Sequence, residues 1–189
     1  MKTLKELAEN RDYNIRKQRY DNYLIAHISG VQKCFEEKFV PYCGLDNTTI
    51  DLIRTQISQH DQSKYSEEEY NAYLDKFYPS DGADKYTINN NFAYAWLHHL
   101  RNNPHHPQYW FLRNDTNHKH DRMLDMPYEY IVEMLCDWGS FAYMDSELKP
   151  GIKPNSNAHN WYRLHGYEFG FSRNTKQQIE DILSKCIDL

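Results

Sequence analysis

The sequence predicts an all-α helical bundle, and three observations indicate this fold class. Helical periodicity runs through most segments, strand signals are scarce, and only seven glycines and seven prolines interrupt the 189 residues. Apolar residues that recur every three or four positions are typical of helices with one buried face. The length suits one hydrophobic core, and no repeat or low-complexity segment divides the chain. We therefore expect a single all-α domain over residues 1–189.

The first long helix is expected at residues 13–39, after a short leading turn over residues 3–9. Pro41 and Gly44 end this helix, because neither residue type continues a helical backbone well. The inward stripe of the helix places His27 among apolar residues at helical spacing: Tyr20, Tyr23, Leu24, Val31 and Phe35.

Two shorter helices are expected next. The first begins at residues 47–49, and its buried face carries four residues at helical spacing: Ile50, Ile53, Ile57 and His60. The second follows Ser66, which has Glu69 three residues later. This spacing is that of a capping box and predicts a helix start there, and Pro79 closes the helix.

A fourth helix is expected at residues 89–103, where Pro104 stops it. Its buried face carries Phe92, Trp96 and His99. Pro107 keeps the following segment irregular, and the polar residues 113–125 predict a loop or a small hairpin.

A strong helix is expected from Pro127 to about residue 144. One stripe of this helix carries Tyr130, Met134, Asp137 and Phe141. Residues 149–171 are rich in proline, asparagine and glycine, and we expect a long loop there. Asn174 begins a closing amphipathic helix with four residues inward: Ile179, Ile182, Leu183 and Cys186.

Composition narrows the function classes. A formal net charge of -5 gives no basic surface for stable nucleic-acid binding. The charged segment after Met1 is unlike a signal peptide, and no apolar run reaches the length that spans a membrane. The cysteines form no CxxC pair, so we expect free thiols and a soluble protein of a reducing cytoplasm. Whether the chain forms a homo-oligomer stays open.

Histidines and aspartates on inward helix faces predict a metal site, because imidazole and carboxylate bind cations such as zinc, iron and manganese. Asp137 carries most weight, since a carboxylate on an apolar stripe is costly unless it is paired or binds a cation. Adjacent helical residues point about 100° apart, so His60 and Asp61 can reach one ion only near a helix end. With His27, these residues form the first candidate ligand set.

A second candidate set follows in the sequence: His99, His105 and His106. It lies near enough to the first set to add ligands for another ion. The stripe through Trp96 favours His99 over its neighbour His98 as a ligand. Lys64 and Arg101 are placed in the sequence to contact an anionic group such as a phosphate.

The order of these residues resembles the HD-domain metal-dependent phosphohydrolase superfamily. His60-Asp61 with Lys64 forms an HD-x-x-K motif, which is preceded by His27 and followed by further histidines and a terminal aspartate, Asp137. The segments HDQSKYSEEEYNAY, AWLHH, NNPHHPQYW and EMLCDW, with a later WY, are similar to an uncharacterised family common in bacterial and phage genomes. This similarity covers roughly residues 20–185.

The resemblance implies an HD-domain-like bundle that binds one or two divalent cations (Mn, Fe, Co, Zn, Ni or Mg). It assigns the first ion to His27, His60, Asp61 and Asp137. It assigns the second ion to His99, His105 and His106, with Asp61 bridging both ions. The chain departs from the family pattern at Gln108, where glutamate is common, so a carboxylate role there is in doubt. The Gly-Tyr-Pro signature of cyclic-dinucleotide phosphodiesterases is absent, which argues against that substrate.

Three functions fit these residues. The leading one is an enzyme, a metal-dependent hydrolase of phosphoric ester or anhydride bonds that acts on a nucleotide or a similar small phosphoester. Asp61, Lys64 and Arg101 would act on the substrate, in a bacterial cytoplasm or in the host cytoplasm if the chain is phage-encoded. The alternatives are a di-iron HD-type oxygenase and a non-catalytic phage protein that sequesters a nucleotide or contacts a host protein.

Several of these residues also have structural interpretations. Asn-Pro-His-His-Pro fits a rigid turn in which His105 and His106 bond backbone carbonyls. His120-Asp121 repeats the HD dipeptide, but its polar surroundings predict a solvated loop. The acidic run 67–69 fits the first turn of a helix and needs no chemistry.

Overall fold

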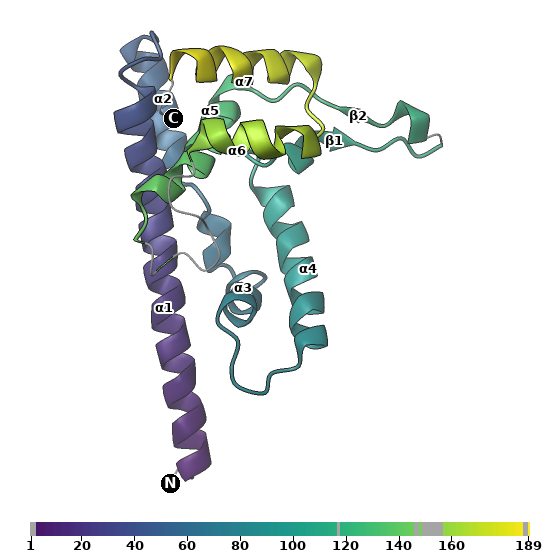
Figure 1. The fold of residues 1–189 in the computed structure, drawn as a ribbon. Coiled ribbons are helices and arrows are strands. Elements are labelled where there is room, and N and C mark those ends of the chain that lie inside the picture. The colour runs from purple at the N-terminus through teal and green to yellow at the C-terminus, as the bar shows by residue number, and fades with distance from the viewer. Residues whose placement is uncertain (1–2, 117, 146–147, 149–156, 187–188) are drawn as a thin grey trace.

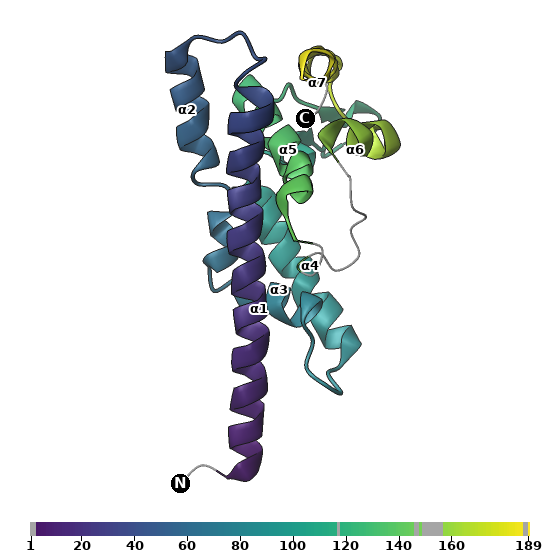
Figure 2. The ribbon, with the colours of Figure 1, turned by 60° about the vertical axis from the view of Figure 1, so that its left-hand side comes forward.

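The computed structural model describes residues 3–116, 118–145, 148, 157–186 and 189, and it confirms the all-α class. Within this described part, strand structure is limited to a short antiparallel pair, β1 (Phe111–Leu112) and β2 (Arg122–Met123). These strands pair Phe111 with Met123 and form a small hairpin, one of the two forms expected for residues 113–125, but β1 begins before that segment. The other helices lie beside the middle and the C-terminal part of one long N-terminal helix, whose N-terminal end extends beyond them (Figures 1 and 2).

Helix α1 (Leu4–Cys34) runs along most of the molecule and continues through a π-helical turn, Phe35–Phe39. Thr3 caps it in a reciprocal capping box with Glu6. The separate leading turn expected over residues 3–9 is therefore wrong, because these residues form the first turns of α1 itself.

The next three helices are α2 (Asn47–Ile57), α3 (Tyr70–Phe77) and α4 (Lys85–Asn102). A 3-10 turn, Gln62–Tyr65, connects α2 to α3. Asp46 caps α2, and Asp84 caps α4, so α4 begins earlier than its apolar pattern indicated.

The capping box expected from Ser66 and Glu69 does not form. The side chain of Glu69 makes no capping bond to α3. Its carboxylate instead accepts hydrogen bonds from His98 and His99 of α4, both at 2.8 Å. A local capping pattern is overridden here by contacts between distant residues.

Helix α5 (Tyr128–Ser140) is buried along nearly its whole length and packs against α1, α2, α6 and α7. The chain continues into a 3-10 turn, Phe141–Tyr143. Shorter 3-10 turns occur at Pro107–Trp110, His118–His120 and Gly166–Glu168.

The C-terminal part differs from the expected loop. Helix α6 (Ala158–His165), capped by Asn157, lies within residues 149–171, and residues 149–156 lie outside the described part of the chain. Eight residues are too few to show helical periodicity clearly among asparagine and glycine. Helix α7 (Arg173–Lys185) closes the chain as expected, with Ile179, Ile182 and Leu183 buried.

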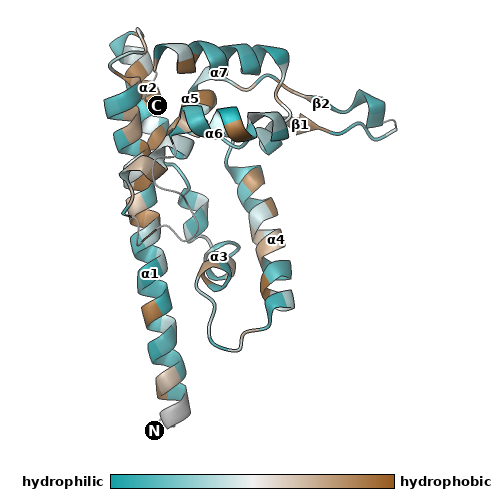
Figure 3. Cartoon of the chain, in the orientation of Figure 1, coloured by the Kyte–Doolittle hydropathy of each residue, from teal (hydrophilic) through white to brown (hydrophobic). Residues whose placement is uncertain are grey.

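The buried apolar residues form two hydrophobic cores. The larger core joins the C-terminal part of α1 to α2, α5 and α7, through residues such as Val31, Ile53 and Ile179. The smaller core joins the middle of α1 to α3 and α4, through Leu24 and Leu74 among others. Most residues of α7 and of the N-terminal half of α1 are hydrophilic (Figure 3). His27 lies on α1 between Leu24 and Val31, where the two cores meet.

All four cysteines are buried free thiols, as expected. Among the described residues, no helix combines the length and apolar character that crossing a lipid bilayer requires.

Candidate metal centre

The structure brings together the side chains of all the predicted metal ligands: His27, His60, Asp61, His99, His105, His106 and Asp137. They come from α1, from the turn after α2, from α4, from the segment that follows α4, and from α5. Five are buried, whereas His106 and Asp137 are partly exposed. The donor atoms of these seven residues form two groups, which we call the first and the second subsite, and a third compact group joins His60 and His105 to Glu133.

The first subsite consists of His27, His60, Asp61 and Asp137. His27 Nε2 lies 3.2 Å from Asp137 Oδ1 and 3.3 Å from Asp61 Oδ2. His60 Nε2 lies 3.3 Å from His27 Nε2 and 3.4 Å from Asp61 Oδ2. Two imidazoles and two carboxylates therefore point at one small volume.

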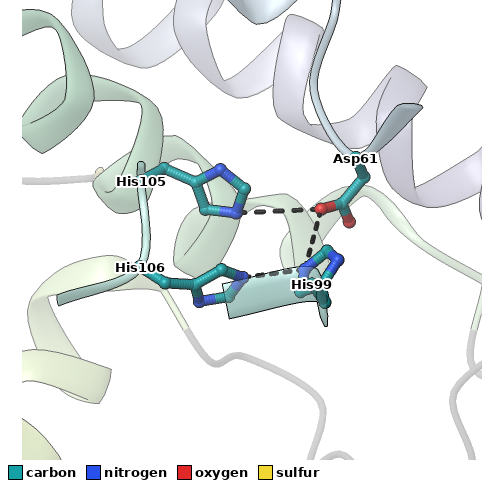
Figure 4. A group of neighbouring side chains, drawn as sticks. All are labelled: Asp61, His99, His105 and His106. Carbon is teal, nitrogen blue, oxygen red and sulfur yellow. Dashed lines mark hydrogen bonds and ion pairs between the residues drawn. The ribbon is translucent and has the colours of Figure 1, made fainter. Parts of the chain in front are cut away.

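The second subsite consists of Asp61, His99, His105 and His106 (Figure 4). His99 Nε2 lies 3.3 Å from Asp61 Oδ1 and 2.9 Å from His106 Nε2. His105 Nε2 lies 3.7 Å from Asp61 Oδ1. Figure 4 shows the carboxylate of Asp61 facing the imidazoles of His99 and His105.

Asp61 belongs to both subsites because its two oxygens face different ligands. Oδ2 faces His27 and His60, and Oδ1 faces His99 and His105. Asp61 has φ of 58°, and it is the one non-glycine residue with positive φ in the described part of the chain. A left-handed residue of this kind is strained and needs support from its surroundings. Asp61 lies in the turn between the end of α2 and the 3-10 turn Gln62–Tyr65. Because the helix ends before His60, as predicted, the side chains of His60 and Asp61 can both point to the first subsite.

Each buried histidine has a partner for its Nδ1 atom. Glu133 Oε1 accepts from His60 Nδ1 at 2.8 Å and from His105 Nδ1 at 3.1 Å. Glu69 accepts from His99 Nδ1 at 2.8 Å, and the Oγ atom of Ser140 lies 3.1 Å from His27 Nδ1. Ligating histidines generally use the second nitrogen in this way, which fixes the ring and directs the other nitrogen to the ion.

Close packing of α1 against α5 supports the Ser140 contact. A Cβ atom at Gly30 would lie 2.8 Å from the backbone oxygen of Ser140, closer than such atoms pack. Only glycine at this position lets α5 approach α1 closely enough to bring Ser140 to His27.

The donor set fits a cation. With Nδ1–H bonded to a carboxylate, Nε2 of His60, His99 and His105 is a hydrogen-bond acceptor, yet it faces carboxylate oxygens, which also accept. Asp61 Oδ1 and His105 Nε2 are buried and have no hydrogen-bond partner. Ligand bonds of about 2.0–2.1 Å place neighbouring donor atoms about 3 Å apart, close to the separations in this cluster. A divalent cation would satisfy the acceptor atoms that neutral imidazoles and carboxylates leave without a donor.

The charges around the cluster also favour a bound cation. The cluster and its partners contain four carboxylates: Asp61, Glu69, Glu133 and Asp137. Lys64 is the single ammonium group that the described residues bring to Asp61. Buried carboxylates are costly unless cations neutralise them. With neutral imidazoles, a bound metal would supply the positive charge that balances these carboxylates.

The electrostatic environment keeps the acids ionised. Burial would raise the pKa of Glu133, but hydrogen bonds from His105 and His60 outweigh it and lower the pKa to about 2. Burial also opposes ionisation of Asp61, yet the nearby His60 and Lys64 hold its pKa well below the usual value. Burial, and then the neighbouring His105 and His99, lower the pKa of His106, which favours the neutral form that a metal ligand needs.

Lys64 and Arg101 differ in their placement. Lys64 is largely buried, and its Nζ lies 2.5 Å from Asp61 Oδ2. Arg101 is exposed on α4, two residues after His99. Residues two apart on a helix point about 200° apart, so the structure does not bring Arg101 to the cluster. The expectation that Arg101 contacts the substrate therefore finds no support in its position.

The remaining histidines lie outside the cluster of donor atoms. His98 is a third exposed and bonds to Glu69 instead. His120 is exposed in the hairpin between β1 and β2, as its polar surroundings predicted. His159 and His165 lie on α6.

Two functional residues were missed in the sequence. Glu69 belongs to an acidic run that is typical of an exposed helix start, yet it is fully buried. Glu133 precedes Asp137 by four residues and lies on the same face of α5. This spacing indicates that the two carboxylates point to the same side of the helix. A carboxylate on the apolar face of a helix needs a partner, and this holds for Glu133 as it does for Asp137.

Comparison with known proteins gives a family and no function. Residues 16–185 match the model of a family described as a family of unknown function (DUF5662). No curated protein and no solved structure matches the chain. Because the match covers most of the 189 residues, the chain belongs to the DUF5662 family.

Proposed function

We propose that the protein is a metal-dependent hydrolase of phosphoric ester or anhydride bonds, built on an HD-type helical scaffold. The main support is the position of Asp61, whose two oxygens face two adjacent groups of metal-ligand side chains. Paired metal sites that share a ligand are suited to phosphoryl chemistry. The order of the ligands along the chain, with His60-Asp61 at the centre, supports membership of the HD superfamily.

Each subsite would hold one divalent cation, and Asp61 would be a ligand in both. Such ions, when bound, supply an activated water nucleophile at neutral pH and stabilise negative charge on phosphoryl oxygens. Imidazole with carboxylate suits Mn, Fe, Co, Ni or Zn better than Mg, which prefers oxygen ligands alone.

Lys64 is the residue best placed to bind the phosphate. Its ammonium group lies beside Asp61, and that carboxylate raises the pKa of Lys64 against the effect of burial, so the side chain is charged. A fixed positive charge in a buried site, where water screens it little, stabilises charge that develops on a phosphoryl oxygen. Asp61 holds Lys64 in place and would orient the attacking water.

The substrate is proposed to be a small phosphorylated molecule, such as a nucleotide. Most donor atoms of the cluster are buried, and the partly exposed members are Asp137 and His106. We propose that a phosphate at the end of a small molecule approaches from that side, because buried donor atoms are less accessible to a folded macromolecule. The net charge of -5 also disfavours nucleic acid as a substrate. The free cysteines agree with a cytoplasmic protein, which is part of the proposal.

The test is phosphate release by the protein loaded with Mn, Co or Fe, measured against a panel of nucleotides and simple phosphoesters. We expect turnover with at least one metal, abolished in the Asp61→Ala variant and kept in the His120→Ala variant. Two bound ions without turnover on any phosphoester would contradict the hydrolase.

The same experiment addresses the two alternatives. An iron-loaded protein that consumes dioxygen in a substrate-dependent reaction would favour the di-iron oxygenase, because imidazoles with a bridging carboxylate also suit iron. Nucleotide affinity that survives His60→Ala and Asp61→Ala would favour a non-catalytic binding protein.

A further inference from the structure

Glu133 is a buried acid that contacts two of the candidate metal ligands. It lies on α5, one helical turn before Asp137, and it is almost completely buried. Its Oε1 atom accepts hydrogen bonds from His60 Nδ1 at 2.8 Å and from His105 Nδ1 at 3.1 Å. Its Oε2 atom accepts from Gln56 Nε2 at 2.7 Å. Both carboxylate oxygens are therefore used, and neither faces solvent.

The two imidazoles that share Oε1 belong to different subsites. His60 is a ligand of the first subsite, and His105 is a ligand of the second. Their ring centroids are 4.4 Å apart. The other orienting contacts each serve one subsite: Ser140 contacts His27 in the first, and Glu69 contacts His99 in the second.

We propose that Glu133 is a positioning residue that couples the two subsites by fixing one imidazole ligand in each through a single oxygen atom. The proposal rests on the metal site proposed above and adds a prediction about how the two ions bind. An ion bound by His60 would hold His60 against Glu133, which would keep Glu133 in place for His105. Filling one subsite should therefore increase the affinity of the other.

A separate metal site at Glu133 is the competing interpretation, because Glu133 with His60 and His105 also forms a compact group of potential ligands. The distances favour hydrogen bonds. The Nδ1–O separations of 2.8 and 3.1 Å are ordinary for N–H donors to a carboxylate, and Gln56 takes the second oxygen. The Nε2 atoms of both rings, by contrast, face Asp61.

The test measures the affinity of each subsite alone. In an Asp137→Ala background the second subsite remains intact, and in a His106→Ala background the first remains intact. Zn²⁺ affinity is measured in both backgrounds by competition with a chromophoric chelator. We expect Glu133→Ala to weaken Zn²⁺ binding roughly 10- to 100-fold in both backgrounds. Glu133→Gln keeps an oxygen acceptor and should restore part of the affinity in each.

Matched controls come from the residues that serve one subsite. Glu69→Ala should weaken binding only where the second subsite is measured, and Ser140→Ala only where the first is measured. A merely structural role for Glu133 would lower stability without this pattern. The proposal is overturned if Glu133→Ala weakens one subsite or neither while the wild type binds two ions. If the wild type binds no ion, the proposed metal site itself fails, which is a different result.

A measurement on the wild type covers the case in which Glu133→Ala does not fold. Long-range nitrogen–proton NMR correlations on the Zn²⁺-loaded protein report which ring nitrogen carries the proton. We expect His60 and His105 both to carry it on Nδ1, the atom that faces Glu133. An Nε2–H tautomer at either residue contradicts the proposal.

Discussion

The ammonium group of Lys64 lies 2.5 Å from Oδ2 of Asp61, the carboxylate oxygen that also faces the first subsite. Asp61 is buried and Lys64 largely so, and the backbone N–H of Lys64 donates to the backbone oxygen of Asp61 at 2.9 Å. Lys64 therefore places a fixed positive charge beside the carboxylate that both subsites share. Such a charge attracts a phosphate and repels a metal cation, so its two effects can be separated by experiment.

Substitution of Lys64 by methionine keeps most of the length of the side chain and removes the charge. We expect turnover of a phosphorylated substrate to fall by roughly 10²–10³, because a charge that stabilises the transition state is lost. Metal affinity should stay the same or increase, since a repelling charge is removed. Steady-state kinetics and a metal titration of Lys64→Met check this, with the exposed Lys185→Met as the control. Unchanged turnover, or loss of the ions, would rule out the phosphate role of Lys64.

His98 and His99 provide a matched pair on one helix. Both bond through Nδ1 to Glu69, but only His99 directs its Nε2 at Asp61. We expect His99→Ala to lose the second ion and His98→Ala to keep both. Metal content of the two purified variants, measured by mass spectrometry, gives the answer. Equal loss in both variants would mean that Glu69 acts on the site through His98 as well.

The left-handed backbone of Asp61 makes a prediction about stability. The left-handed conformation costs a residue with a Cβ roughly 1–2 kcal/mol relative to glycine. Glycine also has more conformational entropy in the unfolded chain, which offsets part of this difference in the free energy of unfolding. In the metal-free protein, Asp61→Gly should therefore be more stable than Asp61→Ala by roughly 0.5–1 kcal/mol. Urea unfolding followed by circular dichroism measures the difference. Equal stabilities would show that the backbone at residue 61 relaxes out of the left-handed region.

Metal binding should stabilise the fold, because the ion neutralises buried carboxylates. At a metal concentration 100 times Kd the gain is about 2.7 kcal/mol, which corresponds to a rise in Tm of roughly 5–10 °C for a chain of this size. Thermal melts with added Mn²⁺ or Zn²⁺ and after chelation check the expected rise and its reversal. The Asp61→Ala variant should show little or no rise. Stabilisation that is equal in the wild type and in this variant would point to metal binding elsewhere.

Much of the candidate site was accessible from the sequence, because local periodicity governs which face of a helix is buried. His27 lies on the stripe of α1 that passes through Leu24 and Val31, and both neighbours are buried. Asp137 lies on the apolar face of α5, as its spacing indicated. The dipeptide His60-Asp61 required a helix end to reach one place, and α2 ends at Ile57.

Other parts of the site depend on contacts between distant residues, which no local pattern contains. Glu69 meets His98 and His99 about 30 positions later, and these contacts replace the capping box that its spacing predicted. Arg101 was assigned by its closeness in sequence to His99, but helical geometry turns it away. Helix α6 was missed because it is short and lies among residues typical of loops.

The metal content of protein purified without chelators tests the central claim most directly. We expect two divalent ions per wild-type chain, one in Asp137→Ala, and two in His120→Ala, because His120 lies away from the cluster. A folded wild-type chain that holds no ion, and binds none when Mn²⁺, Fe²⁺ or Zn²⁺ is supplied, would contradict the claim that these imidazoles and carboxylates form a metal centre.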